Sequence, residues 1–278
     1  MLKRFLAAAI GVPLIFAVVF CSTALPIIID MAMALVCAMS VGEFAHATKT
    51  LRLYQLSIPS IVFSVAFSIL YSFGLGFITA YVYTAVMLSM MIFFHEKISF
   101  KEFAYIYSMT ILITVALSSI TAMKNSHPAH IPFYFLLSLG LPWFADIGAY
   151  FVGSFLGKHK LCPKISPKKT IEGAVGGVIV CILATCLLTW IFADLIYQKT
   201  VWINYLSLCM LAFAGSLFSI LGDLSFSLVK RTFQIKDYGN IIMGHGGMLD
   251  RFDSVIFVAP LIQIFISYFP IMISKTAM

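Results

Sequence analysis

The sequence predicts an all-α membrane protein that crosses the bilayer about nine times. Three observations support this prediction: the composition, the length of the apolar segments and the distribution of the basic residues. Hydrophobic residues make up 62% of the 278 residues and charged residues only 10%, and the mean hydropathy is +1.03. A soluble domain of this length needs many more polar residues to cover its surface, so the composition excludes that class of protein.

Nine segments are apolar enough to form membrane helices, each of which needs roughly 20 mainly apolar residues. The first follows Lys3 and Arg4 and also has the features of a cleaved signal peptide, although a retained helix fits better with a chain that is apolar throughout. We expect about five spans in an N-terminal region, 1–128, and about four in a C-terminal region, 129–278. The nine segments lie at about 5–21, 24–42, 57–73, 76–94, 104–123, 132–156, 171–193, 202–223 and 252–272.

The basic residues provide an independent test of this topology. If the N-terminus is cytoplasmic and the nine helices alternate in direction, fifteen Lys and Arg lie in cytoplasmic segments, whereas Lys124, Lys199 and Lys275 lie outside. Cytoplasmic loops of membrane proteins are enriched in Lys and Arg, so we expect a cytoplasmic N-terminus and an external C-terminus. The same distribution accounts for the isoelectric point of about 9.1, so nucleic acid is not an expected partner.

Ionisable residues are sparse in the first half, where Asp30 lies in the second span and Glu43 at its inner end. We interpret Asp30 as a residue near the outer interface. In the second half, charged residues gather at the expected cytoplasmic side and in one span, which contains Asp146. Charged groups within a bilayer cost about 2.5–3.5 kcal/mol each on insertion scales, so this cluster predicts a functional site. Some of its basic residues also suit a topology signal or contacts with anionic lipids, the interpretation that we favour for Lys158, Lys160 and Lys164.

The carboxylates of this cluster have a spacing that favours a metal site. Asp250 and Asp253 are three residues apart, and Asp223 and Ser227 four apart, so each pair would share one face of a helix. Hard oxygen ligands from two helix ends suit Mg²⁺, which also binds substrate phosphates. The adjacent Gly246-Gly247 pair leaves backbone N–H groups accessible to an anion.

The segment 227–253 contains a long motif made of Ser227-Leu228-Val229-Lys230-Arg231, Lys236-Asp237-Tyr238-Gly239 and Gly244-His245-Gly246-Gly247-Met248-Leu249-Asp250-Arg251-Phe252-Asp253. This motif resembles the signature of the phosphatidate cytidylyltransferase family, also called CDP-diacylglycerol synthases. Met243 departs from the family pattern, which usually has Pro or Gly there. The runs at 166–173 and 222–224 are similar as well, and the likeness covers about 143–254.

The resemblance implies transfer of CMP from CTP to phosphatidate, which yields CDP-diacylglycerol and pyrophosphate for phospholipid biosynthesis. It also implies a bacterial cell-membrane location with the site facing the cytoplasm, membrane lipids as neighbours, and a homodimer as one assembly state. Mg²⁺, with a second cation considered, would bind Asp223, Asp250 and Asp253. Those three residues would act in catalysis with Lys230, Arg231 and His245, of which His245 is assigned to shaping the loop. Substrate contacts are implied for Asp146, Ser166, Lys168, Lys169, Glu172, Ser227, Lys236, Gly246, Gly247 and Arg251.

Two other classes of protein remain as alternatives. A CTP-dependent polyprenol or dolichol kinase would use similar groups but would transfer the γ-phosphate and leave CDP. A membrane transporter would also carry carboxylates within its spans, but it should show repeat symmetry between its halves, which is not apparent in this sequence.

Overall fold

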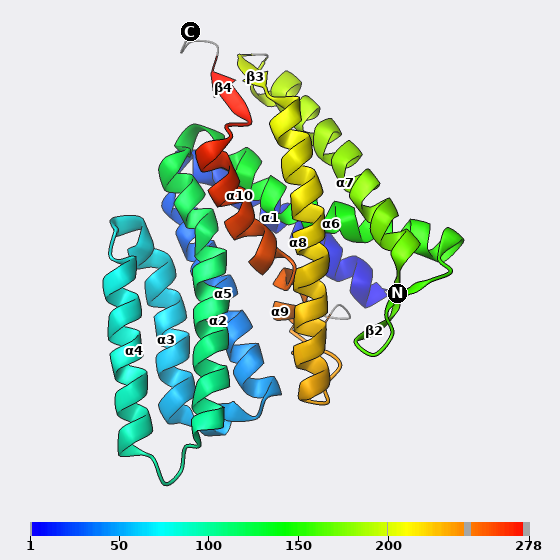
Figure 1. Ribbon diagram of the computed structural model, residues 1–278. Helices are drawn as coiled ribbons and strands as arrows, with labels where there is room; N and C mark the ends of the chain where they lie inside the picture. The colour runs from blue at the N-terminus through cyan, green and yellow to red at the C-terminus, as the bar shows by residue number, and fades with distance from the viewer. Residues whose placement is uncertain (1, 199, 242–245, 275–278) are drawn as a thin grey trace. The chain divides into compact units, whose positions relative to one another are not determined.

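The computed structural model describes residues 2–198, 200–241 and 246–274 and consists mainly of long helices (Figure 1). The predicted helical membrane fold is thereby confirmed, whereas the number of spans and the sides of the two termini stay predictions. Each of the nine predicted segments overlaps one helix. Within the described residues, two apolar helical segments are shorter than a typical span, Pro13–Ser22 and Val255–Tyr268, and seven are long enough to cross a membrane: Ile27–Ala47, Tyr54–Phe73, Gly76–Phe93, Phe100–Ser126, Pro128–Leu156, Ile171–Ile196 and Tyr205–Thr232.

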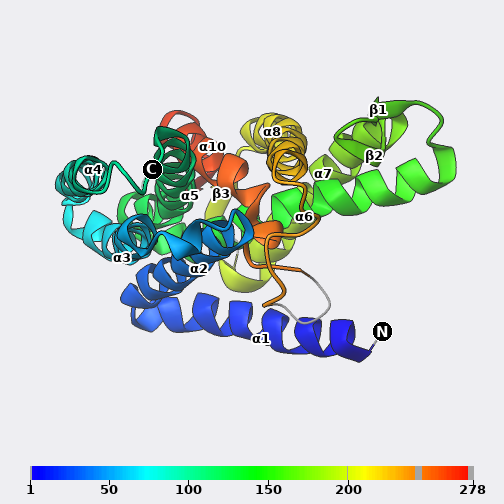
Figure 2. The ribbon, with the colours of Figure 1, turned by 90° about the horizontal axis from the view of Figure 1, so that it is seen from below.

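The chain forms two compact units, and the first comprises residues 1–126 together with 230–252. In this unit α2, α3 and α5 pack against one another, and α4 packs beside α3 (Figures 1 and 2). Side chains that are at most 1% exposed, such as Phe44, Ile106 and Leu117, form its core. Its elements are α1 (Leu2–Ala24), α2 (Ile27–Ala47), η1 (Thr50–Arg52), α3 (Tyr54–Leu70), η2 (Tyr71–Phe73), α4 (Gly76–Phe93), α5 (Phe100–Ser126) and the short α9 (Leu249–Phe252).

Helix α3 buries a row of serines on one face. Ser60, Ser64 and Ser68 are spaced four residues apart and are fully buried, as expected for positions that share one side of a helix. Each hydroxyl donates to a carbonyl three or four residues earlier in α3. The hydroxyls are therefore satisfied within their own helix, and the small side chains allow neighbouring helices to approach closely.

The first unit also contains a buried ion pair. Asp30, in the first turn of α2, is 2% exposed, and its Oδ2 lies 2.5 Å from Nζ of Lys124, near the end of α5. The same ammonium donates to Ser72 Oγ at 3.0 Å. The pair connects two helices whose charged residues are 94 positions apart in the sequence.

The second unit comprises residues 127–229 and 253–278. Helix α6 packs along α7, and α10 packs against α6. Two short antiparallel pairs complete it, β1 with β2 and β3 with β4. Its elements are η3 (Pro128–His130), α6 (Ile131–Leu156), β1 (Lys160–Cys162), β2 (Ser166–Thr170), α7 (Ile171–Ile191), the π-helical turn η4 (Phe192–Ile196), β3 (Val201–Ile203), α8 (Tyr205–Thr232, to Val229 in this unit), α10 (Val255–Tyr268) and β4 (Met272–Ser274).

The contact between α6 and α7 depends on glycine. A Cβ atom added at Gly148 of α6 would lie 3.0 Å from the Cα of Gly177, and one at Gly177 of α7 would lie 2.7 Å from the carbonyl oxygen of Ala145. Both distances are too short for a side chain. Small residues at such positions allow membrane helices to approach closely enough for their backbones to touch.

Two local predictions are corrected by the structure. The eighth span was expected to end near residue 223, but α8 continues to Thr232, because no Gly or Pro interrupts residues 223–232. Lys230 and Arg231 thus lie in its last turn, where positive charge complements the helix dipole. The segment after α6 lies between the predicted spans 132–156 and 171–193, where no regular element was expected, but it contains the β1–β2 hairpin.

The buried ion pair generates a prediction about stability. Replacing Asp30 by Asn leaves the Lys124 ammonium buried without its counter-charge, which should lower the free energy of unfolding by about 3–5 kcal/mol. Glu102→Gln is the matched control, because Glu102 pairs with Arg52, whose side chain is 73% exposed, and exposed pairs contribute little. Unfolding in detergent, followed by intrinsic fluorescence, measures both variants.

The double variant Asp30→Asn with Lys124→Met provides the further test. Removing both charges should recover most of the lost stability, because the penalty comes from one uncompensated charge. Equal stability of Asp30→Asn and the wild type would contradict this account of the pair.

Candidate functional site

Asp250 of α9 is the centre of a hydrogen-bond network in the first unit. Lys230 Nζ donates to Oδ1 at 3.0 Å, and the backbone N–H groups of Tyr238 and Gly247 donate to Oδ2 at 2.9 and 3.1 Å. The side chains of Asp250 and Lys230 are only 5% and 13% exposed. Because hydrogen bonds to a carboxylate are strong where water is largely excluded, the Asp250 side chain is held in one orientation.

Gly246 allows the turn before α9 to form. Its φ of +87° lies in the left-handed region, and a Cβ atom there would approach Asp250 Oδ2 to 3.3 Å. Only glycine adopts this backbone conformation without strain. Gly246 and Gly247 were predicted to present backbone N–H groups to an anion, but the Gly247 N–H is bonded to Asp250.

An aromatic cluster supports the segment that leads to this turn. The Tyr238 ring is 2% exposed, and its centroid lies 6.1 Å from that of Phe44 on α2. Phe233 packs edge-on against Phe44 at 6.2 Å. Lys230 Nζ lies 5.4 Å from the centroid of the Tyr238 ring, within the range of a cation–π contact.

Glu43, near the cytoplasmic end of α2 in the predicted topology, also contacts this segment. Its side chain is buried, and its Oε2 accepts a hydrogen bond of 2.9 Å from the backbone N–H of Leu249, the first residue of α9. We did not predict a role for Glu43 from the sequence. Ionisable residues in membrane spans often have a function. The position of Glu43 at the inner end of the second predicted span could therefore have indicated a role.

The second unit brings together a different set of the predicted residues. Lys169, at the end of the β1–β2 hairpin, forms an ion pair with Asp223 of α8, and both side chains are about one-quarter exposed. A Cβ atom at Gly222 would lie 3.0 Å from the carbonyl oxygen of Asp253, so the backbone of Asp253 lies against the residue before Asp223. Asp253 is 6% exposed and accepts hydrogen bonds from the backbone N–H and the hydroxyl of Ser254.

Asp253 follows α9 in a turn, so it does not share a regular helix with Asp250. Asp223 and Ser227, by contrast, both lie on α8, four residues apart as expected.

Glu172 anchors the hairpin to the start of α7. Its carboxylate accepts hydrogen bonds from the backbone N–H groups of Lys158 and His159 and lies 2.5 Å from Nδ1 of the His159 ring. Thr170 caps α7 by accepting from the backbone N–H of Gly173 at 3.1 Å. We expected Glu172 to contact substrate, but its described partners belong to the hairpin.

The remaining predicted residues fall into three groups. Ser166 and Ser227 are partly buried in the second unit, and His245 lies outside the described residues. Exposed side chains are found at Asp146, Lys168, Arg231, Lys236 and Arg251.

The donor chemistry at the predicted metal ligands fits a cation. Lys230 places its ammonium against the Asp250 carboxylate, and Lys169 does the same at Asp223, so positive charge is already favoured at these oxygens. Carboxylate oxygens are also the ligands that Mg²⁺ prefers. Among residues 2–198, 200–241 and 246–274, no three His, Cys, Asp or Glu side chains form a ready-made metal cluster.

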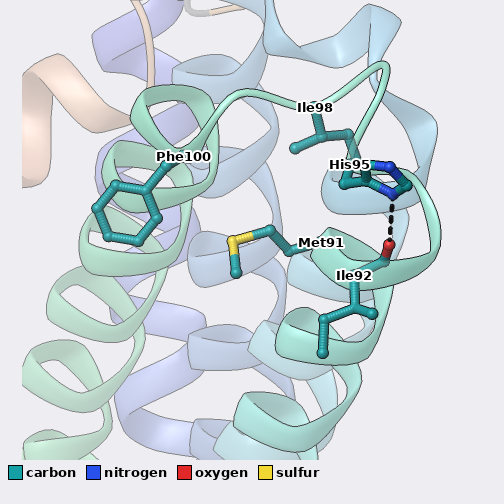
Figure 3. A pocket seen from close by; sticks show the side chains of 5 residues that line it. All are labelled: Met91, Ile92, His95, Ile98 and Phe100. Carbon is teal, nitrogen blue, oxygen red and sulfur yellow. Dashed lines mark hydrogen bonds between the residues drawn. The ribbon is translucent and has the colours of Figure 1, made fainter.

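A separate apolar pocket of about 410 Å³ lies where α4 leads into α5, within the first unit (Figure 3). It is lined by Met91, Ile92, His95, Ile98 and Phe100, and the His95 ring is turned back to bond the carbonyl of Ile92 at 3.1 Å. None of the predicted site residues lines this pocket, so it is not the predicted reaction centre.

The chain is similar to proteins that are named phosphatidate cytidylyltransferase. The protein from Staphylococcus saprophyticus is 39% identical over 183 residues, that from Bacillus subtilis 36% over 184 and that from Staphylococcus aureus strain COL 40% over 183. The matches cover 64–66% of this chain and 65–66% of each relative, slightly less than two-thirds of the relatives' length.

A family model described as the cytidylyltransferase family matches residues 2–269, nearly the whole chain. This match extends beyond the resemblance seen at 143–254 into the apolar first half. The chain therefore belongs to the cytidylyltransferase family.

Proposed function

We propose that this protein is a phosphatidate cytidylyltransferase, which transfers CMP from CTP to phosphatidate and releases pyrophosphate. The observation that carries the proposal is the Asp250 network, because Lys230, Tyr238, Gly247 and Asp250 all belong to the signature segment and bond to one another. Family membership and the names of the relatives support the same reaction. CTP and phosphatidate are the proposed substrates.

The reaction requires two anions to approach each other. A phosphate oxygen of phosphatidate attacks the α-phosphorus of CTP, a new P–O bond forms, and the bond to the β-phosphate breaks as pyrophosphate leaves with the electron pair. The attacking oxygen is already anionic, so no strong general base is needed. Positioning and charge neutralisation are therefore the main catalytic tasks.

Several basic residues are available for this neutralisation. Lys230 and Lys169 are held by carboxylates, so their ammonium groups have defined positions. Lys168, Arg231, Lys236 and Arg251 are exposed and flank the signature elements. We assign the basic residues as a group to the triphosphate and the lipid phosphate.

Magnesium fits this proposal as the cofactor. Asp223, Asp250 and Asp253 would supply carboxylate ligands, and the ion would neutralise phosphate charge during the transfer. A second cation is part of the same proposal. His245 is assigned to the shape of its loop.

The proposed site faces the cytoplasm of a bacterial cell, from the inner membrane. The unequal distribution of Lys and Arg supports this orientation, and CTP is a cytoplasmic nucleotide. We also propose membrane lipids as neighbours and a homodimer as one assembly state.

The orientation can be tested with reporter fusions. A periplasm-active reporter fused after Lys275 should be active, and one inserted near Lys164 should be inactive, because the basic segment around Lys164 stays in the cytoplasm. A cytoplasmic reporter in the same two places should give the opposite pattern. A cytoplasmic C-terminus would show that the span count is wrong by one.

The substrate assignment can be tested with purified protein, CTP and Mg²⁺. Release of pyrophosphate should require phosphatidate, because only a lipid that carries a phosphate supplies the anionic nucleophile. Diacylglycerol or a polyprenol should give no reaction. Formation of CDP with either of those lipids would favour the lipid-kinase alternative.

The role of Asp250 can be tested by Asp250→Asn, which preserves size but removes the charge. If Asp250 holds the metal, kcat should fall by about 100-fold or more, and added Mg²⁺ should recover little of it. Asp237→Asn is the control, because Asp237 is exposed on the same segment, and surface substitutions usually have small effects. Lys168→Ala should instead raise KM for CTP more than it lowers kcat, as expected for a contact made before and during reaction.

Thermal unfolding of each variant separates loss of fold from loss of chemistry. Near-normal turnover of Asp250→Asn with an unchanged Mg²⁺ dependence would overturn the proposed role of Asp250 in binding metal.

A further inference from the structure

Glu43 is a buried carboxylate that contacts the signature segment from a distant helix. It lies on α2, about 200 residues before that segment in the sequence, and its side chain is part of the interior of the first unit. The Leu249 N–H donates to its Oε2 at 2.9 Å. Burying a carboxylate in an apolar helix is unfavourable unless hydrogen bonds compensate for the lost hydration, so this contact requires an explanation.

Two glycines of the signature segment also lie against Glu43. A Cβ atom at Gly239 would lie 2.9 Å from Cγ of Glu43, and one at Gly247 would lie 2.7 Å from Cδ. Real side chains do not approach this closely, so both positions must lack a side chain for the carboxylate to occupy its place. Glu43 therefore contacts the segment at three positions: Gly239, Gly247 and Leu249.

These three positions are directly connected to Asp250. The Gly247 N–H donates to Asp250 Oδ2, and Leu249 immediately precedes Asp250 in α9. Gly239 follows Tyr238, whose N–H donates to the same oxygen. Glu43 thus contacts the backbone beside each of the peptide groups that orient the Asp250 carboxylate.

A glycine-rich backbone needs such support. Glycine has more accessible conformations than any other residue, so a segment that contains Gly239, Gly246 and Gly247 loses more entropy when it is ordered. A small displacement of a catalytic group is enough to slow a reaction strongly. Contacts from a packed helix therefore offer a physical means of keeping Asp250 in position.

We propose that Glu43 is a positioning residue, which fixes the backbone at Gly239, Gly247 and Leu249 so that the Asp250 carboxylate is held in its working orientation. This inference rests on the proposed function for its effect on catalysis. The structural part, that Glu43 orders the segment around α9, stands independently of the reaction. Glu43 acts through the backbone and through Asp250, without contacting the reacting atoms.

The first test compares Glu43→Ala, Glu43→Gln and the control Glu102→Ala in the full-length protein. Glu102 also accepts a hydrogen bond from a backbone N–H, that of Ser99 at 3.1 Å, but it lies outside the signature segment. Hydrogen–deuterium exchange of peptides covering 246–252 and 99–106 measures the local effect. Glu43→Ala should speed exchange at 246–252 and leave 99–106 unchanged, whereas Glu102→Ala should do the reverse.

Turnover should follow the same pattern. Glu43→Ala should lower kcat by at least about tenfold, the effect expected for losing a buried hydrogen bond to a charged group, with a smaller change in KM for CTP. Glu43→Gln keeps an acceptor oxygen for the Leu249 N–H and should recover much of kcat and of the protection. Glu102→Ala should keep near-normal kcat.

A double-mutant cycle tests the steric part of the inference. Gly239→Ala should lower kcat in the wild type, because the new Cβ displaces the Glu43 carboxylate, but it should have little further effect in Glu43→Ala. The same glycine substitution should lower kcat in Glu102→Ala by the factor seen in the wild type, because distant sites act independently. Independent effects of Gly239→Ala and Glu43→Ala would overturn the inference.

The outcomes also separate this inference from the proposed function. If wild-type protein releases no pyrophosphate from CTP with phosphatidate, the proposed function is wrong, and exchange at 246–252 alone decides the role of Glu43. Wild-type exchange at 246–252 in Glu43→Ala overturns the inference, whatever the reaction is. A fall in thermal stability of Glu43→Ala with unchanged kcat also overturns it, because the role would then be structural only.

Discussion

The structure depends on one physical constraint: a charged group removed from water must find its compensation within the protein. The buried ion pairs Asp30–Lys124 and Lys230–Asp250 satisfy this constraint, and Lys169–Asp223 is a third pair that is about one-quarter exposed. Each pair joins segments that are separated in the sequence, so satisfying the charges also fixes the packing. Glu43 meets the same constraint in part, because the backbone N–H of Leu249 in α9 donates to its Oε2. At Lys230–Asp250 and at Glu43, the contacts that compensate charge also hold the signature segment in place.

The same contacts would prepare basic groups for the proposed phosphate chemistry. A lysine side chain has many rotamers, and holding it in one position costs entropy. Asp250 holds Lys230, and Asp223 holds Lys169, so this entropy is lost during folding and not when substrate binds. The aromatic ring of Tyr238 adds a further contact to Lys230. A reaction between two anions is favoured by ammonium groups that are already held in position before the substrates bind.

Local sequence patterns predicted the helices well. Each span overlaps a helix because an apolar run of sufficient length has one stable conformation in a membrane. Helix α8 extends to Thr232, beyond the expected end of the span, because the span was delimited by its apolar residues, whereas Lys230 and Arg231 are charged but compatible with a helix end. The β1–β2 hairpin was missed because its residues carry no alternating apolar pattern, and because Glu172, at the start of α7, holds Lys158 and His159 just before its first strand.

Contacts between distant residues were the part that the sequence could not predict. The signature spacing identified Lys230, Gly247 and Asp250, and the structure bonds these three together. Nothing in a local pattern connects Glu43 with Leu249, which are 206 residues apart, or Asp30 with Lys124. Such pairs depend on how the helices pack, and this packing cannot be inferred from the local patterns of a single sequence. The sequence motif includes Gly239 and Gly247, but only the structure shows that the nearby Glu43 carboxylate leaves no room for a side chain at either position.

The proposed reaction directs a phosphate oxygen of phosphatidate to the α-phosphorus of CTP. The most direct measurement uses purified protein, Mg²⁺ and phosphatidate with CTP labelled either at the α- or at the γ-phosphorus, followed by separation of lipid from soluble products. With the proposed transfer, we expect the α-label in the lipid and the γ-label in pyrophosphate. Entry of the γ-label into the lipid, with CDP as the soluble product, would contradict it.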